Sequence, residues 1–497
     1  MKLLFPIIHT LVLLFTLSAI PEEAARLPIF ETFDLAIGET VETRTGAKLT
    51  LVSVNEPKGA VWGEISRPEV TVTVDGESAT LVAGMYRLPE PINGIQLDCP
   101  ITGGLRNSSH INHWRLEKDA RLRVWPADAP WVAKGTFGYP LEQRWFASHT
   151  AFSNEPVSAR PNGQLYYHAG LDLGGCESLT RVVAATDALV VSAGNHIVRG
   201  HEKTAGSPVD ARYDVLYLLD DRGWYYRYSH LHSFDPTIKP GMKVKKGQLL
   251  GLLGKMGGSG GWSHLHFEIK SLQPSGKWGT QDAYAFLHQG YREKYSPELL
   301  AVARPGHIAV AGGTVSHDGS RSWSDDGKIA SYQWQFSDGT TASGALVKKE
   351  YPLPGTFRET LTVTHSNGET DVNFVRVKVF SRGEDGAMVA PPRLHASYNP
   401  TFGIKPNQPI TFKVRAFGTT HGEETWDFGD GSPPVKTKSD GNIEQLAPDG
   451  YAVIEHRYEK PGNYLVHVKR IDEHNRLAED RLYVRVGTPP TADRKGK

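Results

Sequence analysis

The segment that decides the fold is a glycine-rich stretch followed by two histidines, Gly257-Gly-Ser-Gly-Gly-Trp-Ser-His264-Leu-His266-Phe-Glu-Ile269. The apolar run that begins at His264 predicts a β-strand, and alternate side chains of a strand point to the same face. Both imidazoles are therefore expected in one site. The glycines allow the backbone to fold close over that site, or allow a substrate strand to lie against it.

Two other segments offer side chains for the same site. His168 and Asp172 are four residues apart, and His230 follows Tyr228-Ser229. Two histidines and one carboxylate can hold a zinc ion with a fourth position open to water, as catalytic zinc sites do. Zinc lowers the pKa of its water to about 7, which makes hydroxide available at neutral pH. The sequence therefore predicts a zinc hydrolase.

The composition favours a mostly β protein of several domains. The chain has 497 residues, with 51 glycines, 32 prolines and a formal net charge of +0. This charge balance gives no support for nucleic acid as a partner, since a binding face for nucleic acid is basic. The cysteines are Cys99 and Cys176. The sequence leaves open whether they form one disulfide or remain two buried thiols, and Cys176 is a disfavoured further zinc ligand.

The N-terminal half divides into segments of different character. Residues 1–25 combine a lysine, an apolar run and small residues, which predicts a cleaved signal peptide, with an uncleaved membrane anchor as the alternative. No membrane span is expected after cleavage. Alternating strands and an Asp75-Gly76 turn predict a small β domain of unknown role over 27–130. Residues 135–295 contain the histidine segments, short strands on either side of Thr186-Asp187, and a hairpin across 220–223.

The C-terminal part of the chain repeats itself. Trp334-Gln-Phe-Ser-Asp-Gly339 in the first copy corresponds to Trp426-Asp-Phe-Gly-Asp-Gly431 in the second. Each copy continues with an aromatic residue, a Pro-Gly turn and an alternating strand, which predicts Ig-like β-sandwiches at 300–382 and 390–487 with Trp334 and Trp426 in their cores. Both copies resemble PKD domains. The tail at 488–497 is expected to be disordered.

Four segments together resemble the M23, or lysostaphin-like, metallopeptidases over about residues 140–290. They are His168-x-x-x-Asp172, Tyr228-x-His230-Leu, the Gly241–Gly251 stretch and His264-Leu-His266-Phe-Glu-Ile. The short strands and the hairpin of residues 135–295 predict an antiparallel sheet. The resemblance implies Zn2+ on His168, Asp172 and His266, and catalytic roles for His230 and His264. It also implies a secreted or periplasmic endopeptidase of the cell envelope that acts on peptidoglycan stems or cross-bridges.

The sequence departs from the family pattern at Gly174–Thr180 and in an insertion at 196–210. Both differences would reshape the walls of a groove and change substrate choice more than chemistry. The alternatives to the enzyme are a non-catalytic cell-wall binding or adhesion protein that retains the fold, and a hydrolase of other peptides. Intact His230 and His264 favour the enzyme. The PKD-like repeats are expected to act as spacers or to bind a surface polymer or protein.

Several other residues have weaker claims on a site. Glu268 and Tyr228 are candidates for orienting the histidines, with an ordinary strand role equally open. His110 and His113 are expected to be exposed loop residues, and His232 is expected to be an ordinary surface or core residue with no role in the site. The Asp325-Asp326 pair, near Asp318, suggests calcium, although a solvated turn is the favoured interpretation.

Overall fold

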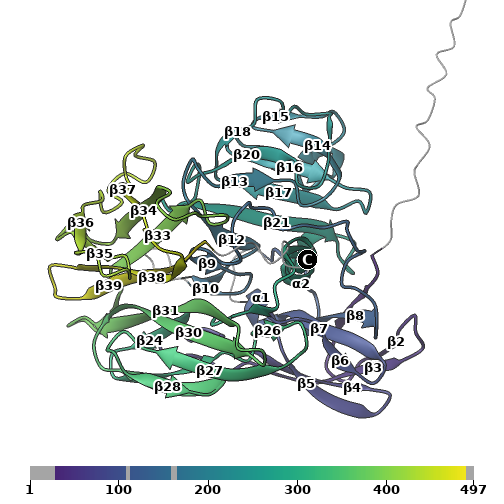
Figure 1. Ribbon diagram of the computed structural model, residues 1–497. Helices are drawn as coiled ribbons and strands as arrows, with labels where there is room; N and C mark the ends of the chain where they lie inside the picture. Colours follow the sequence, from purple (N-terminus) through teal and green to yellow (C-terminus); the bar gives the residue numbers. More distant parts are fainter. Residues whose placement is uncertain (1–27, 108–111, 158–164, 488–497) are drawn as a thin grey trace, which may run out of the picture.

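The computed structural model describes residues 28–107, 112–157 and 165–487 and confirms a mostly β protein. An N-terminal β domain, a central domain and two β-sandwiches lie against one another (Figure 1). The expected signal peptide (1–25), the tail (488–497) and His110 lie outside the described residues. Among the residues that are described, no helix combines the length and the apolar character needed to cross a membrane.

The N-terminal domain is built from two small antiparallel sheets around an apolar core. Its elements are β1 (Glu31–Leu35), β2 (Thr40–Glu42), β3 (Lys48–Asn55), β4 (Glu69–Val74), β5 (Glu77–Val82), β6 (Glu90–Ile92), β7 (Ile95–Thr102), α1 (Gly103–Asn107) and β8 (Ala120–Pro126). The strands are ordered β1-β8-β7-β6 and β2-β3-β4-β5. The expected hairpin is present: β4 pairs with β5 around Asp75 (φ 48°) and Gly76 (φ 87°), the positive φ angles that such a turn requires.

The central domain holds a large twisted sheet, a smaller sheet and a helix. Its elements are β9 (Thr150–Ala151), β10 (Pro156–Val157), β11 (Tyr166–Tyr167), β12 (Leu171–Gly174), β13 (Arg181–Val183), β14 (Ala188–Ala193), β15 (His196–Ile197), β16 (Leu216–Leu219), β17 (Tyr225–Ser229), β18 (Leu231–Phe234), β19 (Lys243–Val244), β20 (Leu249–Leu253), β21 (His264–Leu272), β22 (Trp278–Gln281) and α2 (Tyr284–Tyr295). The sheets are ordered β15-β14-β16-β17-β21-β12-β9 and β13-β20-β18. The expected β16–β17 hairpin forms. Strands β13 and β14 flank Thr186-Asp187 as expected but belong to different sheets.

Strand register in the large sheet brings distant histidine segments together. On one side of β21, Asp172 of β12 lies opposite His266, and on the other side Ser229 of β17 also lies opposite His266. Leu265 and Phe267 point to the opposite face and are fully buried in the core. Burial of each such side chain stabilises the fold by about 1.5–3 kcal/mol, so the alternation of β21 fixes which face carries the imidazoles.

The two sandwiches share one sheet. The first contains β23 (Leu299–Leu300), β24 (His307–Val310), β25 (Gly313–Asp318), β26 (Trp323–Ser324), β27 (Ile329–Gln335), β28 (Thr341–Ser343), β29 (Leu346–Tyr351), β30 (Gly355–His365), β31 (Thr370–Arg382) and β32 (Met388–Val389). The second contains β33 (Arg393–Asn399), β34 (Ile410–Phe417), β35 (Glu424–Asp427), β36 (Val435–Thr437), β37 (Ala452–His456), β38 (Gly462–Ile471) and β39 (Leu477–Val486). Because β30 pairs with β39 in parallel, the order β24-β31-β30-β39-β38-β35-β36 runs through both. Trp334 and Trp426 are buried in the two cores, as predicted.

The sandwiches pack directly against the central domain (Figure 1). Arg304 donates a hydrogen bond to the carbonyl of Thr150 (2.9 Å), and the Ser148 hydroxyl donates to the carbonyl of Ala396 (2.6 Å). These contacts are buried. The repeats are thus packed on the central domain instead of being separated from it by a solvated linker, and their expected role as spacers or as binders of a surface polymer or protein stays a prediction.

Candidate metal centre

Three of the predicted site residues converge on one point. Asp172 Oδ1 lies 3.1 Å from His168 Nε2 and 2.9 Å from His266 Nδ1. These three side chains, which we call the three-ligand cluster, each offer one ligand atom within 4.8 Å of the others. Metal–ligand bonds of about 2.0–2.1 Å in a tetrahedral site put neighbouring ligand atoms about 3.3 Å apart, so the spacing fits a zinc ion.

The residues around the cluster fix which nitrogen of each imidazole is available. His168 Nδ1 lies 3.0 Å from the carbonyl oxygen of Gly170, so Nδ1 carries the proton and Nε2 keeps its lone pair. His266 Nε2 lies 3.9 Å from Glu268 Oε2. Glu268 is buried and accepts hydrogen bonds from Lys270 (2.8 Å) and Thr280 (2.7 Å). A carboxylate behind a metal-binding histidine orients the ring, which favours the orienting role for Glu268.

Gly170 gives the chain the turn that places His168 and Asp172 together. Its φ is +85°, in the left-handed region that favours glycine. A Cβ atom at this position would lie 3.0 Å from the carbonyl oxygen of Phe267 and 3.1 Å from His266 Cε1. The absence of a side chain therefore allows both the turn and the close approach of β21.

His230 and His264 lie beside the cluster. His264 Nε2 is 3.4 Å from Asp172 Oδ1, and the His264 and His230 rings are 4.7 Å apart. His230 Nδ1 lies 2.7 Å from the carbonyl oxygen of Met256, and His264 Nδ1 lies 3.0 Å from that of Trp262. Each histidine therefore donates through Nδ1 and leaves Nε2 for the site.

The backbone at His230 is itself unusual. Its φ is +68°, a conformation that costs a non-glycine residue on the order of 1–3 kcal/mol. The backbone N–H of His230 donates to Asp214 Oδ2 (3.1 Å), which helps to hold this geometry at the junction of β17 and β18. The strained conformation aims the imidazole at the cluster.

Burial and neighbouring charges shift the pKa values of these groups in different directions. Burial opposes charge on Asp172, but His168 and His264 outweigh it and hold the pKa of this carboxyl well below its usual range. Burial also opposes charge on His168, while Asp172 raises its pKa above the usual value. Burial lowers the pKa of His230 to about 4, only partly offset by Asp214. His230 is therefore an uncharged imidazole at neutral pH and can accept a proton.

A cavity of about 440 Å³ contains these five residues. One wall is the glycine loop with Trp262, and another is formed by Arg376, Lys378 and Arg393 of the two sandwiches. Its volume lies in the range of about 300–1,000 Å³ that is common for ligand sites. All five predicted residues are thus brought together in one accessible space.

Comparison with known proteins assigns three parts of the chain. The sequence model of peptidase family M23 matches residues 166–277, which include the five histidine and aspartate residues of this site. PKD domain models match residues 298–379 and 394–481. The chain carries an M23 metallopeptidase domain followed by two PKD domains. The predicted resemblance is confirmed.

Individual relatives match shorter stretches. Collagenase ColA of Clostridium perfringens is 30% identical over 82 residues, or 16% of this chain and 7% of the collagenase. Pre-pro-metalloprotease PrtV of Vibrio cholerae is 34% identical over 86 residues, or 17% of this chain and 9% of PrtV. The chain therefore spans less than a tenth of the length of either relative.

Solved structures with local similarity cover up to half of the chain. Helicobacter pylori Csd3 has 17% sequence identity and a TM-score of 0.23, covering 49% of this chain and 50% of Csd3. The PKD1 domain of Vibrio anguillarum Epp has 26% identity and a TM-score of 0.15, covering 17% of this chain and 94% of that domain.

The second PKD domain holds the glycine loop of the M23 domain in place. The backbone N–H of Ser263 donates to the Tyr451 hydroxyl (2.7 Å), and Arg415 donates to the carbonyl of Gly261 (2.7 Å). Between these anchors, the Trp262 ring stacks on His264 at 3.9 Å. A domain that lies far along the sequence thus helps to position a histidine of the M23 site, which no local sequence pattern indicates.

The less favoured candidates for site residues lie outside the three-ligand cluster. Cys99 and Cys176 are free and buried, which settles the disulfide question and leaves Cys176 outside the group of metal ligands. His232 is exposed and lies outside the cavity lining. The prediction for His113 is wrong, because this residue is half-buried and burial lowers its pKa. The Tyr228 hydroxyl accepts from the backbone N–H of Ala185 (2.9 Å), so this ring is a core residue.

The acidic residues of the first PKD domain do not form the suggested calcium group. Asp318 pairs with Arg87 (3.1 Å) and Arg321 (2.9 Å). Asp325 and Asp326 are exposed and lie 3.4 and 2.9 Å from His365 Nε2. Asp318 is therefore not part of a ligand set with Asp325 and Asp326. These two aspartates and His365 offer ligand atoms within 4.8 Å of one another, a set with an imidazole nitrogen in place of the all-oxygen set that calcium prefers.

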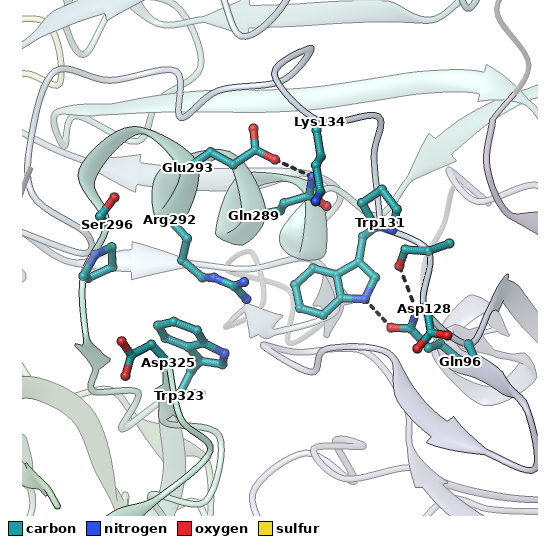
Figure 2. A pocket seen from close by; sticks show the side chains of 14 residues that line it. Gln96, Asp128, Trp131, Lys134, Gln289, Arg292, Glu293, Ser296, Trp323 and Asp325 are labelled. Carbon is teal, nitrogen blue, oxygen red and sulfur yellow. Dashed lines mark hydrogen bonds between the residues drawn. The ribbon is translucent and has the colours of Figure 1, made fainter. Parts of the chain in front are cut away.

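A second cavity, of about 710 Å³, lies between α2, residues 127–134 and β26 (Figure 2). The Arg292 guanidinium lies over the ring of Trp323 (4.1 Å) and 5.7 Å from that of Trp131. Trp131 donates through its indole N–H to Gln96 (2.9 Å). The described residues that line this cavity include no histidine or cysteine, so the chemistry of a metallopeptidase belongs to the smaller cavity.

Proposed function

We propose that this protein is a secreted zinc endopeptidase that hydrolyses peptide bonds in peptidoglycan stems or cross-bridges. The observation that carries the proposal is the convergence of His168, Asp172 and His266 in one cavity with His230 and His264 beside them. The match to peptidase family M23 over the same residues supports a peptidase. The signal-like segment at 1–25 supports export to the cell envelope.

Zinc would be held by His168 Nε2, Asp172 Oδ1 and His266 Nδ1, and when bound it supplies a water of lowered pKa and polarises the substrate carbonyl. Two neighbouring imidazoles then act on the reacting groups. His230 is uncharged at neutral pH and presents Nε2 to the cavity, so it accepts the proton of the attacking water and returns it to the leaving amine.

His264 supplies the second polar contact. Its Nε2 faces Asp172, and Trp262 stacks on its ring, so its position beside the cluster is fixed. When protonated, it donates a hydrogen bond to the oxyanion that develops on the scissile carbonyl. A positioned donor of this kind contributes about 10²–10³-fold in rate, and a positioned acid or base about 10²–10⁴-fold.

The test is the release of new amino groups from purified murein. We expect the zinc-loaded full-length protein to release amines, a chelator to abolish the release, and His264→Ala to lose most of it. His232→Ala is the matched control, since this exposed histidine lies two residues from His230 and outside the cavity lining. A protein that sediments with murein but releases no amines would instead be the non-catalytic binding protein.

A further inference from the structure

We propose that Arg376, Lys378 and Arg393 of the PKD domains bind a carboxylate of the substrate, so that the enzyme selects peptides with a carboxylate close to the scissile bond. These three residues are called the cationic wall below. The proposal rests on the peptidase function proposed above and extends it to the class of peptide that the site accepts.

The cationic wall belongs to the same cavity as the three-ligand cluster. Arg376 and Lys378 are two residues apart on β31, so both side chains point to one face of the first PKD domain. Arg393 begins β33 of the second PKD domain. All three are half-buried. Two domains therefore present positive charge to the space in front of His168 and His266.

Within the described part of the chain, the side chains of Arg376 and Lys378 form no hydrogen bond and no ion pair, although other cavity arginines do. Arg212 donates to Asp214 (2.7 Å), and Arg227 lies 4.0 Å from Glu268. Arg393 places its guanidinium over the ring of Phe417 (3.7 Å), which leaves its N–H groups free of a carboxylate partner among the described residues. As far as the described residues go, the cationic wall thus has donors without acceptors.

Glu155 is the carboxylate that shares this part of the cavity, and it is already engaged. Its Oε1 accepts hydrogen bonds from the Tyr86 hydroxyl (2.5 Å) and from the backbone N–H of Phe152 (3.0 Å). It attracts Arg376 and Lys378 only through space. The other carboxylate of the lining, Asp172, belongs to the three-ligand cluster. Glu155, and Asp480 from outside the lining, therefore offset part of the charge of the cationic wall from a distance, without pairing directly with any of its three side chains among the described residues.

The three like charges act unfavourably on one another. Burial, with the charges of Arg376 and Arg393, lowers the pKa of Lys378 well below its usual range. Burial and the charge of Arg393 lower the pKa of Arg376 to about 10. Unpaired charge in such a place is costly for the folded protein, and the negative charge of a bound anion would offset the cost of burying these groups and their mutual repulsion. Charges held in this way in a cleft mark a binding function.

A carboxylate of the substrate peptide is the anion that fits. An extended peptide rises about 3.3 Å per residue, so a cavity of this size holds only a few residues on either side of a bond at the cluster. Arginine guanidinium groups match a carboxylate with paired hydrogen bonds, and a lysine adds a point charge. The carboxylate is either the C-terminal group of the peptide or an acidic side chain, and the two sources are separable by experiment.

The experiment uses synthetic peptides that contain the bond cut in murein, and the zinc-loaded full-length protein. One pair of peptides differs only in a C-terminal carboxylate or carboxamide, and a second pair only in glutamate or glutamine. We expect kcat/KM to fall roughly 10- to 100-fold when the recognised carboxylate is neutralised, the size of a lost charge-assisted hydrogen bond. The pair that shows the fall identifies the source.

Variants then assign the effect to the cationic wall. Lys378→Gln and Arg376→Gln should lower kcat/KM for the carboxylate peptide toward that of its neutral partner and leave the neutral peptide nearly unchanged. Lys348→Gln, an exposed lysine of β29 in the same PKD domain, is the matched control and should change neither. Lys378→Met should not lower the melting temperature, because it removes a charge without a partner.

Equal rates of wild-type protein on both members of each pair would overturn the inference, whatever the variants do. If Lys378→Gln unfolds, this comparison of peptides on the wild-type protein still decides the matter. Cleavage of murein without preference for a carboxylate would leave the peptidase function standing and refute the cationic wall as a substrate site. No cleavage of murein or of any peptide would refute the peptidase function itself.

Discussion

Replacement of Gly170 by alanine tests how the cluster is built. The new Cβ atom would have to adopt φ +85° and would lie 3.0 Å from the carbonyl oxygen of Phe267 and 3.1 Å from His266 Cε1. The left-handed conformation costs about 1–2 kcal/mol for a residue with a side chain. The two close contacts must also be relieved. One of them displaces His266 Cε1, the atom bonded to the ligand atom Nδ1.

The matched control is Gly247→Ala, where φ is +83° and no atom lies within 4 Å of the added Cβ. Gly247→Ala should lose about 1–2 kcal/mol of unfolding free energy in urea, and Gly170→Ala should lose more, because its two close contacts must also be relieved. Only Gly170→Ala should also weaken zinc binding, by about 10- to 100-fold, as changes around metal ligands commonly do. Competition with a chelating dye measures this affinity. Equal zinc affinity of the two alanine variants would refute the argument that β21 must approach the turn so closely.

Three further predictions address the residues around the cluster. His264→Ala should retain one zinc ion by elemental analysis and lose about 10²–10³-fold in kcat; loss of zinc or an unchanged kcat would contradict the assigned role. The pKa of His230 is about 4 in the folded protein against 6.5 normally, so as the pH falls the unfolded chain takes up this proton first. Because of this residue, the free energy of unfolding of the metal-free protein should fall by about 3 kcal/mol between pH 7 and pH 4. Urea titrations should show that this fall is absent in His230→Gln. Tyr451→Phe leaves the buried N–H of Ser263 without its acceptor, at a cost of about 1–3 kcal/mol. It should lower kcat with unchanged circular dichroism, whereas Tyr464→Phe should leave kcat unchanged.

Local periodicity predicted the parts of the structure that depend on neighbouring residues. The period of two in a strand is enough to put His264 and His266 on one face of β21, with Leu265 buried behind them. The hairpin of β16 and β17 needed only two strands and a turn between them. The repeated Trp426 motif likewise indicated a buried core position, because its spacing recurs with the rest of the sandwich pattern.

Local sequence patterns could not predict contacts between segments that lie far apart in the chain. Val375, Val377 and Val379 alternate with Arg376 and Lys378, which is typical of a strand with one face in solvent. In the structure, the charged face lines the cavity of another domain. The sequence specifies that this face of the strand is polar. The packing of the PKD domains on the M23 domain determines that the face lines the cavity of the metal site.

The position of His168 and Asp172 illustrates the same limit within one domain. Their spacing of four residues is compatible with a shared site in several backbone conformations. Only the pairing of β12 with β21, which sets Asp172 opposite His266, closes the cluster. The family resemblance supplied this long-range information, because it rested on several segments in a fixed order rather than on one motif.

Zinc titration of the metal-free protein, with amine release from murein measured at each step, tests the central claim most directly. Activity should rise linearly to one equivalent of zinc and then level off, and His266→Ala should show neither high-affinity binding nor activity. Full activity in the absence of metal, or stoichiometric zinc retained by His266→Ala, would contradict the assignment of His168, Asp172 and His266 as the ligands.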